Sequence, residues 1–409
     1  MKTAILRASL FTPAGRGRWG LPLLFWGEPG VGKSAVLREC ARAAGLPCEV
    51  LSPGERGEGA FGVVPVPARD DAAVPRGASR GPEALARLSS TVLTYPRPEW
   101  TRQFDEALAG LVVVDEITTC PPALQPALLG LLLDRRVGGH YLGDRVRVVA
   151  AANPPEQAAT GYDLPLPVAN RVAHVAWGAP SVEEHVAFML RGDAAEDAAP
   201  AIDPVSEEAR VMRLWPEAYA QACGRGAAFL TRRPALKNVC PPAGDPRGSR
   251  GWPSDRSWEH ATRAFATAAV HALTDVERDE LVAGFVGDGA AGEMLAFAAE
   301  QDLADPAAVL DGRESFRHEA KRLDRTAALL SGCAALVVPA GAAKRADRAR
   351  ALWDLLGAFV AGGADQDVAV PCAAALVRAK LHTAPGAIKV LAAIQPLLKA
   401  AGVTPGSVS

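Results

Sequence analysis

The stretch LPLLFWGEPGVGKSAVLRECARAA, residues 21–44, decides the fold. Its apolar run 21–26 predicts a strand, residues 27–34 match the pattern G-x-x-x-x-G-K-[ST], and residues 35–44 predict a helix. In this order, glycine-permitted turns let successive backbone N–H groups converge on an anion at the positively polarised start of a helix. We therefore expect the chain to bind the phosphates of a nucleoside triphosphate.

Within this loop, two side chains have specific predicted tasks. Lys33 is expected to reach the terminal phosphates, and the Ser34 hydroxyl is expected to bind Mg²⁺. The alternative is a chance glycine-rich turn, which eight matching positions between a strand and a helix disfavour. The residues expected to surround the phosphates are Gly27, Glu28, Pro29, Gly30, Val31, Gly32, Lys33, Ser34 and Ala35.

The length and composition indicate a globular protein of several units. The chain has 409 residues, of which 49% are hydrophobic and 22% charged, so we expect about two to four domains. Only 6% of residues are aromatic, which together with many alanines and leucines favours helices. The formal charge of −2 gives no electrostatic case for binding nucleic acid or an anionic membrane.

Cysteine usage and the N-terminus predict a cytoplasmic location. The seven cysteines are an odd number with no C-x-x-C pair, which is typical of a reducing compartment. No secretory signal is evident at the start, and no segment approaches the roughly 20 apolar residues that span a bilayer. We expect no contact with a membrane.

Short apolar runs alternate with helical stretches in the first part of the chain. The runs 21–26, 49–52, 111–114, 146–152 and 172–177 predict a parallel sheet with helices on both faces. Beyond residue 180 the pattern becomes helical, with helices expected at 181–190, 206–221 and 258–272. We expect a nucleotide-binding α/β domain at 1–180, an α-helical lid at 181–290 and an α-helical region at 291–409.

Polar residues follow two of these predicted strands. The run LVVVDE ends in Asp115 and Glu116, which predicts an acid that binds Mg²⁺ and a second acid that polarises the attacking water. The strand in VRVVAAANPP ends at Asn153, whose amide can orient that water. The alternatives are a strand that simply ends in solvated acids and an Asn-Pro turn.

These three elements resemble the AAA+ ATPases, and specifically their MoxR-like branch. GEPGVGKS corresponds to Walker A, LVVVDE to Walker B and Asn153 to sensor 1. LPLPVANRVAHV resembles the L-P-x-x-x-x-N-R-F stretch of that branch, which makes Arg171 the candidate arginine finger. WPSDRSWEHATR resembles its P-S-x-R-x-W stretch, which makes Arg256 the candidate sensor 2, with Arg263 as its competitor.

Each of these arginines has a plainer interpretation, in which Arg171 only flanks a strand and Arg256 only caps a helix. The resemblance also implies an insertion, for which EGAFGVVPVPA is suitably placed, and a hairpin, for which DRRVGGHYLGDRVRV is suitably placed. The first is expected either to contact a client protein or to pack on its own domain. GASRG at 77–81 fits a serine-hydrolase pattern, but the strand that should precede it is missing.

The resemblance implies a Mg²⁺-dependent ATPase that binds ATP and ADP and works as a homo-oligomeric ring, with six subunits expected. It also implies a protein client, for which relatives suggest a von Willebrand A-domain protein. No residue identifies the base, so ATP and GTP both stay open. Two alternatives stay open as well: a nucleotide-gated interaction module with little turnover, and a nucleic-acid motor, which the near-neutral charge disfavours.

Overall fold

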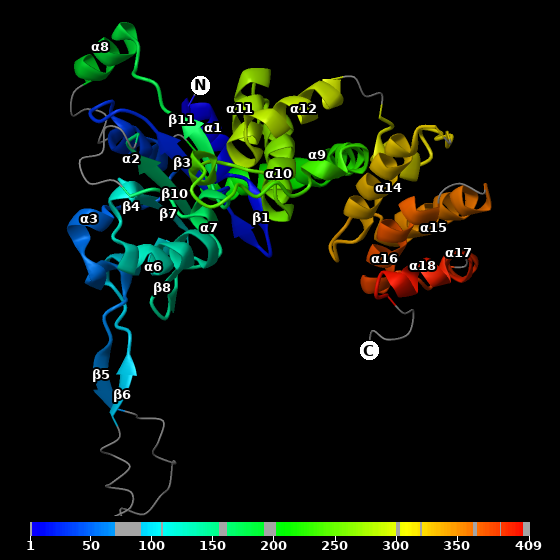
Figure 1. Ribbon diagram of the computed structural model, residues 1–409, viewed down its shortest axis with the longest axis horizontal. Helices are drawn as coiled ribbons and strands as arrows, with labels where there is room; N and C mark the ends of the chain where they lie inside the picture. The colour runs from blue at the N-terminus through cyan, green and yellow to red at the C-terminus, as the bar shows by residue number, and fades with distance from the viewer. Residues whose placement is uncertain are drawn as a thin grey trace, which may run out of the picture. The chain divides into compact units, whose positions relative to one another are not determined.

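The computed structural model describes residues 2–69, 91–107, 109–154, 162–191, 202–299, 303–319, 321–362, 366–384 and 386–403. The chain divides into two compact units, whose elements are labelled in Figure 1. The sheet unit comprises Ala14–Arg171 and Val175–Pro204, and the helical unit comprises Met1–Pro13, Val172–His174 and Val205–Ser409. The GASRG pattern lies outside the described residues. The three predicted domain boundaries stay predictions.

A five-stranded sheet organises the sheet unit. Its strands lie in the order β11-β3-β10-β7-β4, so β10 separates β3 from β7. The pairs β3–β10, β10–β7 and β7–β4 are parallel. The bounds are β3 Leu23–Trp26, β4 Cys48–Leu51, β7 Gly110–Val114, β10 Val146–Ala152 and β11 Ala173–Ala176.

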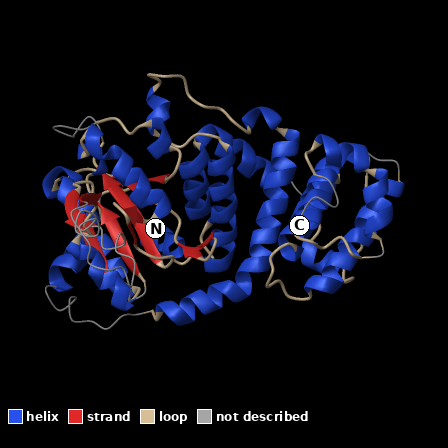
Figure 2. Ribbon diagram, turned by 90° about the horizontal axis from the view of Figure 1, so that it is seen from below, coloured by secondary structure: helices blue, strands red, loops and turns tan. Residues whose placement is uncertain are grey.

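The three central strands are buried along their whole length. Every residue of β3, β7 and β10 is buried, as expected for parallel strands covered on both faces. Helix α2 (Lys33–Ala43) packs against β4 and β7, and helices flank the strands in Figure 2. This confirms the predicted α/β class: a parallel sheet flanked by helices, followed along the chain by a helical region.

The insertion after β4 contains an antiparallel ribbon that the sequence pattern did not predict. Strand β5 (Val66–Arg69) pairs with β6 (Thr91–Thr94), and Leu93 is 71% exposed. The predicted hairpin is present as β8 and β9, with Gly138-Gly139 between them. The remaining elements of this unit are β1 Pro13–Gly15, β2 Arg18–Trp19, α3 Pro53–Arg56, η1 Glu58–Phe61, η3 Glu99–Arg102, α5 Gln103–Ala107, η4 Ile117–Thr119, η5 Pro122–Leu124, α6 Gln125–Leu129, η6 Gly130–Asp134, β8 Arg136–Val137, β9 His140–Tyr141, α7 Leu166–Ala169 and α8 Val182–Arg191.

The helical unit begins with α1, which the sequence pattern also did not predict. Its longest helix, α9, reaches Arg232 and continues past Pro216, so the helix predicted at 206–221 was too short. The bounds are α1 Lys2–Leu10, α9 Pro204–Arg232, η9 Pro234–Leu236, η10 Pro246–Ser249, α10 Asp255–His271, α11 Asp275–Val286, α12 Asp288–Ala299, α13 Pro306–Leu310, α14 Leu323–Val337, α15 Arg345–Ala361, η11 Gln366–Val368, α16 Val370–Arg378, α17 Ala387–Ala393 and α18 Gln395–Ala400.

The apolar core of the C-terminal helices is centred on α15. Helical spacing places Ala349, Leu352, Trp353, Leu356, Phe359 and Val360 on one face of this helix, and all six side chains are buried. Trp353 is fully buried, and its indole N–H donates to Leu381 O at 2.7 Å. Apolar residues at this spacing form the stripe by which a helix packs against a core.

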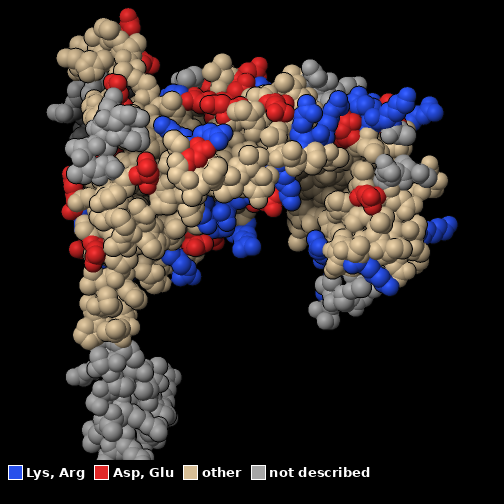
Figure 3. Space-filling model, viewed as in Figure 1, with Lys and Arg blue, Asp and Glu red and all other residues tan. Residues whose placement is uncertain are grey.

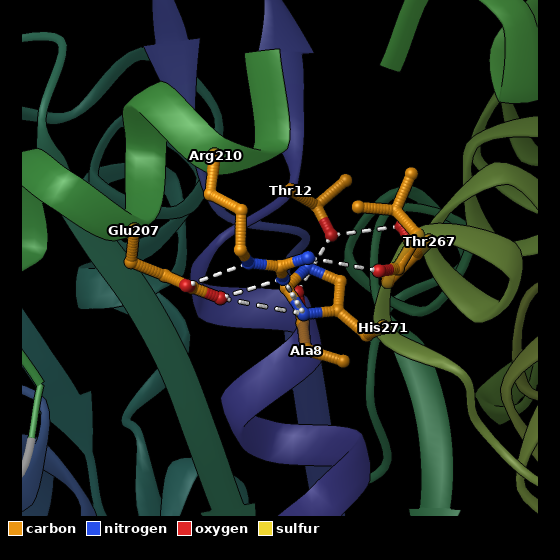
Figure 4. Close-up of polar contacts among 7 residues, drawn as sticks. Ala8, Thr12, Glu207, Arg210, Thr267 and His271 are labelled. Carbon is orange, nitrogen blue, oxygen red and sulfur yellow. Dashed lines mark hydrogen bonds and ion pairs between the residues drawn. The ribbon is translucent and has the colours of Figure 1, made fainter. Parts of the chain in front are cut away.

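A polar cluster joins α1, α9 and α10 (Figure 4). Arg210 donates to both carboxylate oxygens of Glu207, at 2.8 and 2.9 Å, and lies 3.4 Å from the His271 ring nitrogen Nδ1. Nearby, the Thr12 and Thr267 hydroxyls share a hydrogen bond of 2.8 Å. Burial, with the Arg210 charge as the second cause, lowers the pKa of His271 to about 4. The ring is therefore neutral at neutral pH.

On the face shown in Figure 3, basic and acidic side chains of the helical unit lie close together. Asp311 illustrates the mixing, because it accepts from Arg348 at 2.9 Å and from Lys344 at 3.4 Å. Lys344 and Arg348 therefore both have an acidic partner in Asp311. Among the helices of the described residues, none is both long enough and apolar enough to cross a lipid bilayer.

Candidate active site

The sheet register brings the predicted site residues to one edge. Ala152 pairs with Trp26, and Ala150 pairs with Val114, so β3, β10 and β7 end side by side. Beyond the last pair, Gly27 N–H still donates to Ala152 O at 3.1 Å. Gly27, Asn153 and Asp115 each come directly after one of these strands, so they meet where parallel sheets place ligand sites.

The loop between β3 and α2 depends on glycine at three positions. Gly30 and Gly32 have φ angles of 79° and 80°, which side-chain-bearing residues adopt only at a cost. Gly27 is needed for close packing, because a Cβ there would lie 2.6 Å from Trp177 O. The loop is therefore fixed both by its own turns and by the chain that follows β11.

Lys33 lies at the centre of this loop. Its side chain is only 7% exposed, and its ammonium donates to Gly27 O at 2.8 Å, Glu28 O at 2.9 Å and Asn153 Oδ1 at 2.8 Å. Burial lowers the pKa of Lys33, while the charges of Asp115 and Glu116 act in the opposite direction. A buried ammonium that, among the described residues, now donates only to neutral oxygen atoms is suited to donating to the charged oxygens of a phosphate group.

Ser34 and Asp115 supply oxygen atoms at one point. The Ser34 hydroxyl donates a short hydrogen bond to Asp115 Oδ2, and Asp115 N–H is held by Leu51 O at 2.8 Å. Hydroxyl and carboxylate oxygens are the hard ligands that Mg²⁺ prefers. The donor chemistry of these two residues therefore fits the predicted metal.

Glu116 and Asn153 lie beside each other at the open side of the site. The Glu116 side chain is exposed, and its Oε1 lies 3.5 Å from Asn153 Nδ2, at the long end of hydrogen-bonding range. Asn153 thus contacts Lys33 through its carbonyl oxygen and Glu116 through its amide. The structure brings all five predicted polar residues of this site together: Lys33, Ser34, Asp115, Glu116 and Asn153.

For the two candidate arginines, Arg171 and Arg256, no described contact joins either side chain to these five residues. Arg171 follows α7, is partly buried and donates to Pro167 O through Nη1. Arg256 is exposed on the first turn of α10, which opens with a capping box formed by Ser254 and Ser257. Its competitor Arg263 is buried and pairs with Glu259 at 2.9 Å. Both assigned roles stay predictions.

Two contributors to the site were missed from the sequence. Trp177 packs against Gly27, and the Thr119 hydroxyl donates to Glu116 O at 2.8 Å. The one signal in the sequence that could have pointed to Thr119 is its place three residues after Glu116, the second acid of the Walker B motif. No signal in the sequence pointed to Trp177, since its contact with Gly27 arises only when β11 joins the sheet.

No protein-family model matches the chain, and no curated protein matches it. Among solved structures, a protein from Cytophaga hutchinsonii ATCC 33406 named "putative ATPase" is similar to it. The match covers 70% of this chain and 80% of that chain, at 15% identity and a TM-score of 0.44. A likeness of this size carries no weight for function, which rests on the residues described above.

Proposed function

We propose that the chain is a Mg²⁺-dependent ATP hydrolase of the AAA+ type. The observation that carries this proposal is the convergence of Lys33, Asp115, Glu116 and Asn153 at the ends of three adjacent strands, beside a glycine-shaped loop. Phosphoryl transfer is mostly positioning and charge stabilisation, and this set offers both. The same residues would offer neither if the fold held them apart.

Each residue then has one task in hydrolysis. The loop N–H groups and Lys33 hold the β- and γ-phosphates, with Lys33 exchanging its carbonyl partners for phosphate oxygens. Ser34 and Asp115 would hold Mg²⁺, which when bound neutralises part of the phosphate charge. Asn153 orients a water molecule, and Glu116 accepts its proton as the water oxygen attacks the γ-phosphorus and the bond to the bridging oxygen breaks.

Substitution of Glu116 tests this assignment. Glu116→Gln keeps the side-chain volume but removes the proton acceptor, so we expect Mg-ATP binding within about threefold of the parent and turnover reduced by at least about 100-fold. Phosphate release and nucleotide occupancy are measured on the same samples.

The matched control for this test is Glu55→Gln. Glu55 is an exposed acid on α3, in the same unit, and no hydrogen bond or ion pair of its side chain occurs among the described residues. Its replacement should leave both quantities unchanged. Equal turnover by Glu116→Gln and the parent would overturn the role of Glu116.

The finer assignment within this class is to the MoxR-like branch. It is supported by Walker A, Walker B, Asn153 and the arginine segments, together with a ribbon and a hairpin in the places where that branch carries its insertions. On this assignment the chain acts as a cytoplasmic ring, six-membered by resemblance, that remodels a protein client. A von Willebrand A-domain protein is the client class that the resemblance suggests.

One other function remains in view, a nucleotide-gated interaction module that binds ATP and hardly hydrolyses it. The Glu116–Asn153 distance of 3.5 Å favours it, because a long hydrogen bond positions the Glu116 carboxylate poorly for accepting a proton. Full nucleotide occupancy without phosphate release from the parent chain would select the module over the hydrolase.

A further inference from the structure

The turn that follows β7 holds Glu116 from both sides. On its N-terminal side, Glu116 N–H donates to Asp115 Oδ1 at 3.1 Å. On its C-terminal side, Glu116 O accepts from both the backbone N–H and the hydroxyl of Thr119, each at 2.8 Å. We propose that Thr119 is a positioning residue for Glu116, an inference that deepens the proposed hydrolysis and rests on it.

The backbone of Glu116 explains why an anchor is needed. Glu116 has φ 51° and ψ 46°, the left-handed conformation that residues with a side chain rarely adopt. Such a conformation persists only where the surroundings fix it, and it determines the direction in which the Glu116 side chain leaves the backbone. Loss of the Thr119 hydroxyl would leave the Glu116 carbonyl with one donor in place of two, and we expect Glu116 then to leave this conformation more often and its carboxylate to move away from Asn153.

Neighbouring contacts fix the anchor itself. Thr119 belongs to the short helix η4 (Ile117–Thr119), and the preceding carbonyl, Thr118 O, accepts from Tyr162 N–H at 2.8 Å. On the other side, Gly54 of α3 lies so close that a Cβ there would be 3.0 Å from Thr119 Oγ1 and 3.4 Å from Thr119 Cβ. The absence of a side chain at Gly54 therefore leaves the space in which the Thr119 hydroxyl lies.

This arrangement separates binding from catalysis. The phosphates are held by the loop and Lys33, which Thr119 does not contact in the described residues. Loss of the Thr119 hydroxyl should consequently lower kcat without raising KM, because only the orientation of the Glu116 carboxylate is affected.

The first experiment compares three variants of the full chain. Thr119→Val keeps the branched shape and removes the hydroxyl, so kcat should fall about tenfold with KM for Mg-ATP within about twofold of the parent. Thr119→Ser restores the donor and should recover most of the rate.

The control is Thr118→Val, the same change one residue earlier, where the side-chain hydroxyl has no hydrogen bond among the described residues. It should behave as the parent. A Thr119→Val enzyme with parental kcat, or one whose loss Thr119→Ser fails to restore, would overturn the inference.

A second measurement does not depend on activity. Amide hydrogen exchange of the nucleotide-free protein should be faster at 116–120 in Thr119→Val than in the parent, and unchanged in Thr118→Val. Gly54→Ala, which would push on the hydroxyl, should reproduce the Thr119→Val pattern. Equal exchange at 116–120 in the parent and Thr119→Val would contradict the anchoring of Glu116.

The two measurements separate the two proposals. Absence of turnover in a parent chain that binds nucleotide would overturn the proposed hydrolysis, and with it the catalytic consequence assigned to Thr119. The exchange comparison would still decide whether Thr119 holds the turn in place.

Discussion

Asn153 connects the cation of the site to its exposed acid. Its carbonyl oxygen accepts from Lys33 at 2.8 Å, while its amide faces Glu116 at 3.5 Å. An asparagine can do this because one side chain carries both an acceptor and a donor. An aspartate would lose the donor toward Glu116, and an alanine would lose both contacts.

We therefore predict that Asn153→Ala lowers kcat by about 10- to 100-fold, since Glu116 and the attacking water both lose a partner. Nucleotide affinity should change by less than about fivefold, because the loop and Lys33 remain. Steady-state phosphate release and equilibrium nucleotide titration measure the two effects. Asn238→Ala, at an exposed position of the helical unit, is the control, and an Asn153→Ala enzyme with parental kcat would refute the prediction.

At Gly27 we predict a loss of stability. Gly27→Ala would place its Cβ 2.6 Å from Trp177 O and 2.9 Å from Trp177 Cβ, so the sheet edge must shift. We expect destabilisation by about 1–3 kcal/mol, measured by thermal or denaturant unfolding. Gly59→Ala is the comparison, because a Cβ at Gly59 meets no atom within 4 Å. Equal melting temperatures for the two variants would refute the prediction.

The residues of the site differ in how well their roles could be predicted from the sequence. Lys33, Ser34, Asp115 and Glu116 were predictable because a local pattern encodes each of them. Thr119 and Trp177 were not, because their contacts depend on how the turn after β7 and the chain after β11 fold back onto the site. The roles of Arg171 and Arg256 remain predictions for a similar reason, since a pattern places them and no described contact tests them.

Among the elements, helix α9 shows why boundaries are harder to predict than faces. Gly224 and Gly226 follow the predicted end of this helix and resemble stop signals, yet both lie buried within it. A Cβ at Gly224 would be 2.7 Å from Ala328 O of α14, so the missing side chain serves the close approach of two helices. That requirement is tertiary, and the local pattern does not contain it.

The junction of α1, α9 and α10 yields a prediction for pH. His271 has a folded-state pKa of about 4, below the ordinary 6.5, so the unfolded chain binds the proton first as pH falls. The contribution of His271 to the free energy of unfolding should be fully present above about pH 6.5. It should be lost as the pH falls toward 4, and the total loss should be at most about 3 kcal/mol.

Melting temperatures between pH 7 and pH 4.5 test this prediction. His271→Gln should flatten the decline, whereas His185→Gln, at an exposed histidine of α8, should leave it unchanged. An identical decline in the parent and His271→Gln would show that another group is responsible.

At the scale of the whole molecule, the proposed function requires a residue that one chain supplies to the active site of another. In the proposed ring, Arg171 serves the nucleotide of the neighbouring subunit, because a permanently charged planar guanidinium can offset charge on the γ-phosphate. Head-to-tail contacts that close on themselves produce a cyclic oligomer. An isolated chain would then be an incomplete enzyme.

This arrangement predicts complementation between inactive variants. Lys33→Ala and Arg171→Ala chains should each be inactive alone, while their mixture should regain part of the turnover. The Lys33→Ala subunit supplies the arginine that its neighbour's intact loop requires. A mixture with the double variant in place of Lys33→Ala is the control. Full activity of Arg171→Ala alone would remove Arg171 from the mechanism.

The central claim is that the loop after β3 and the acids after β7 form one Mg-ATP site. Calorimetric titration of Mg-ATP into the full chain, beside Lys33→Ala, tests it most directly. We predict saturable binding of about one nucleotide per parent chain and no heat of binding for Lys33→Ala, because the buried cation is lost. A flat titration of the parent chain, or parental affinity in Lys33→Ala, would contradict the account.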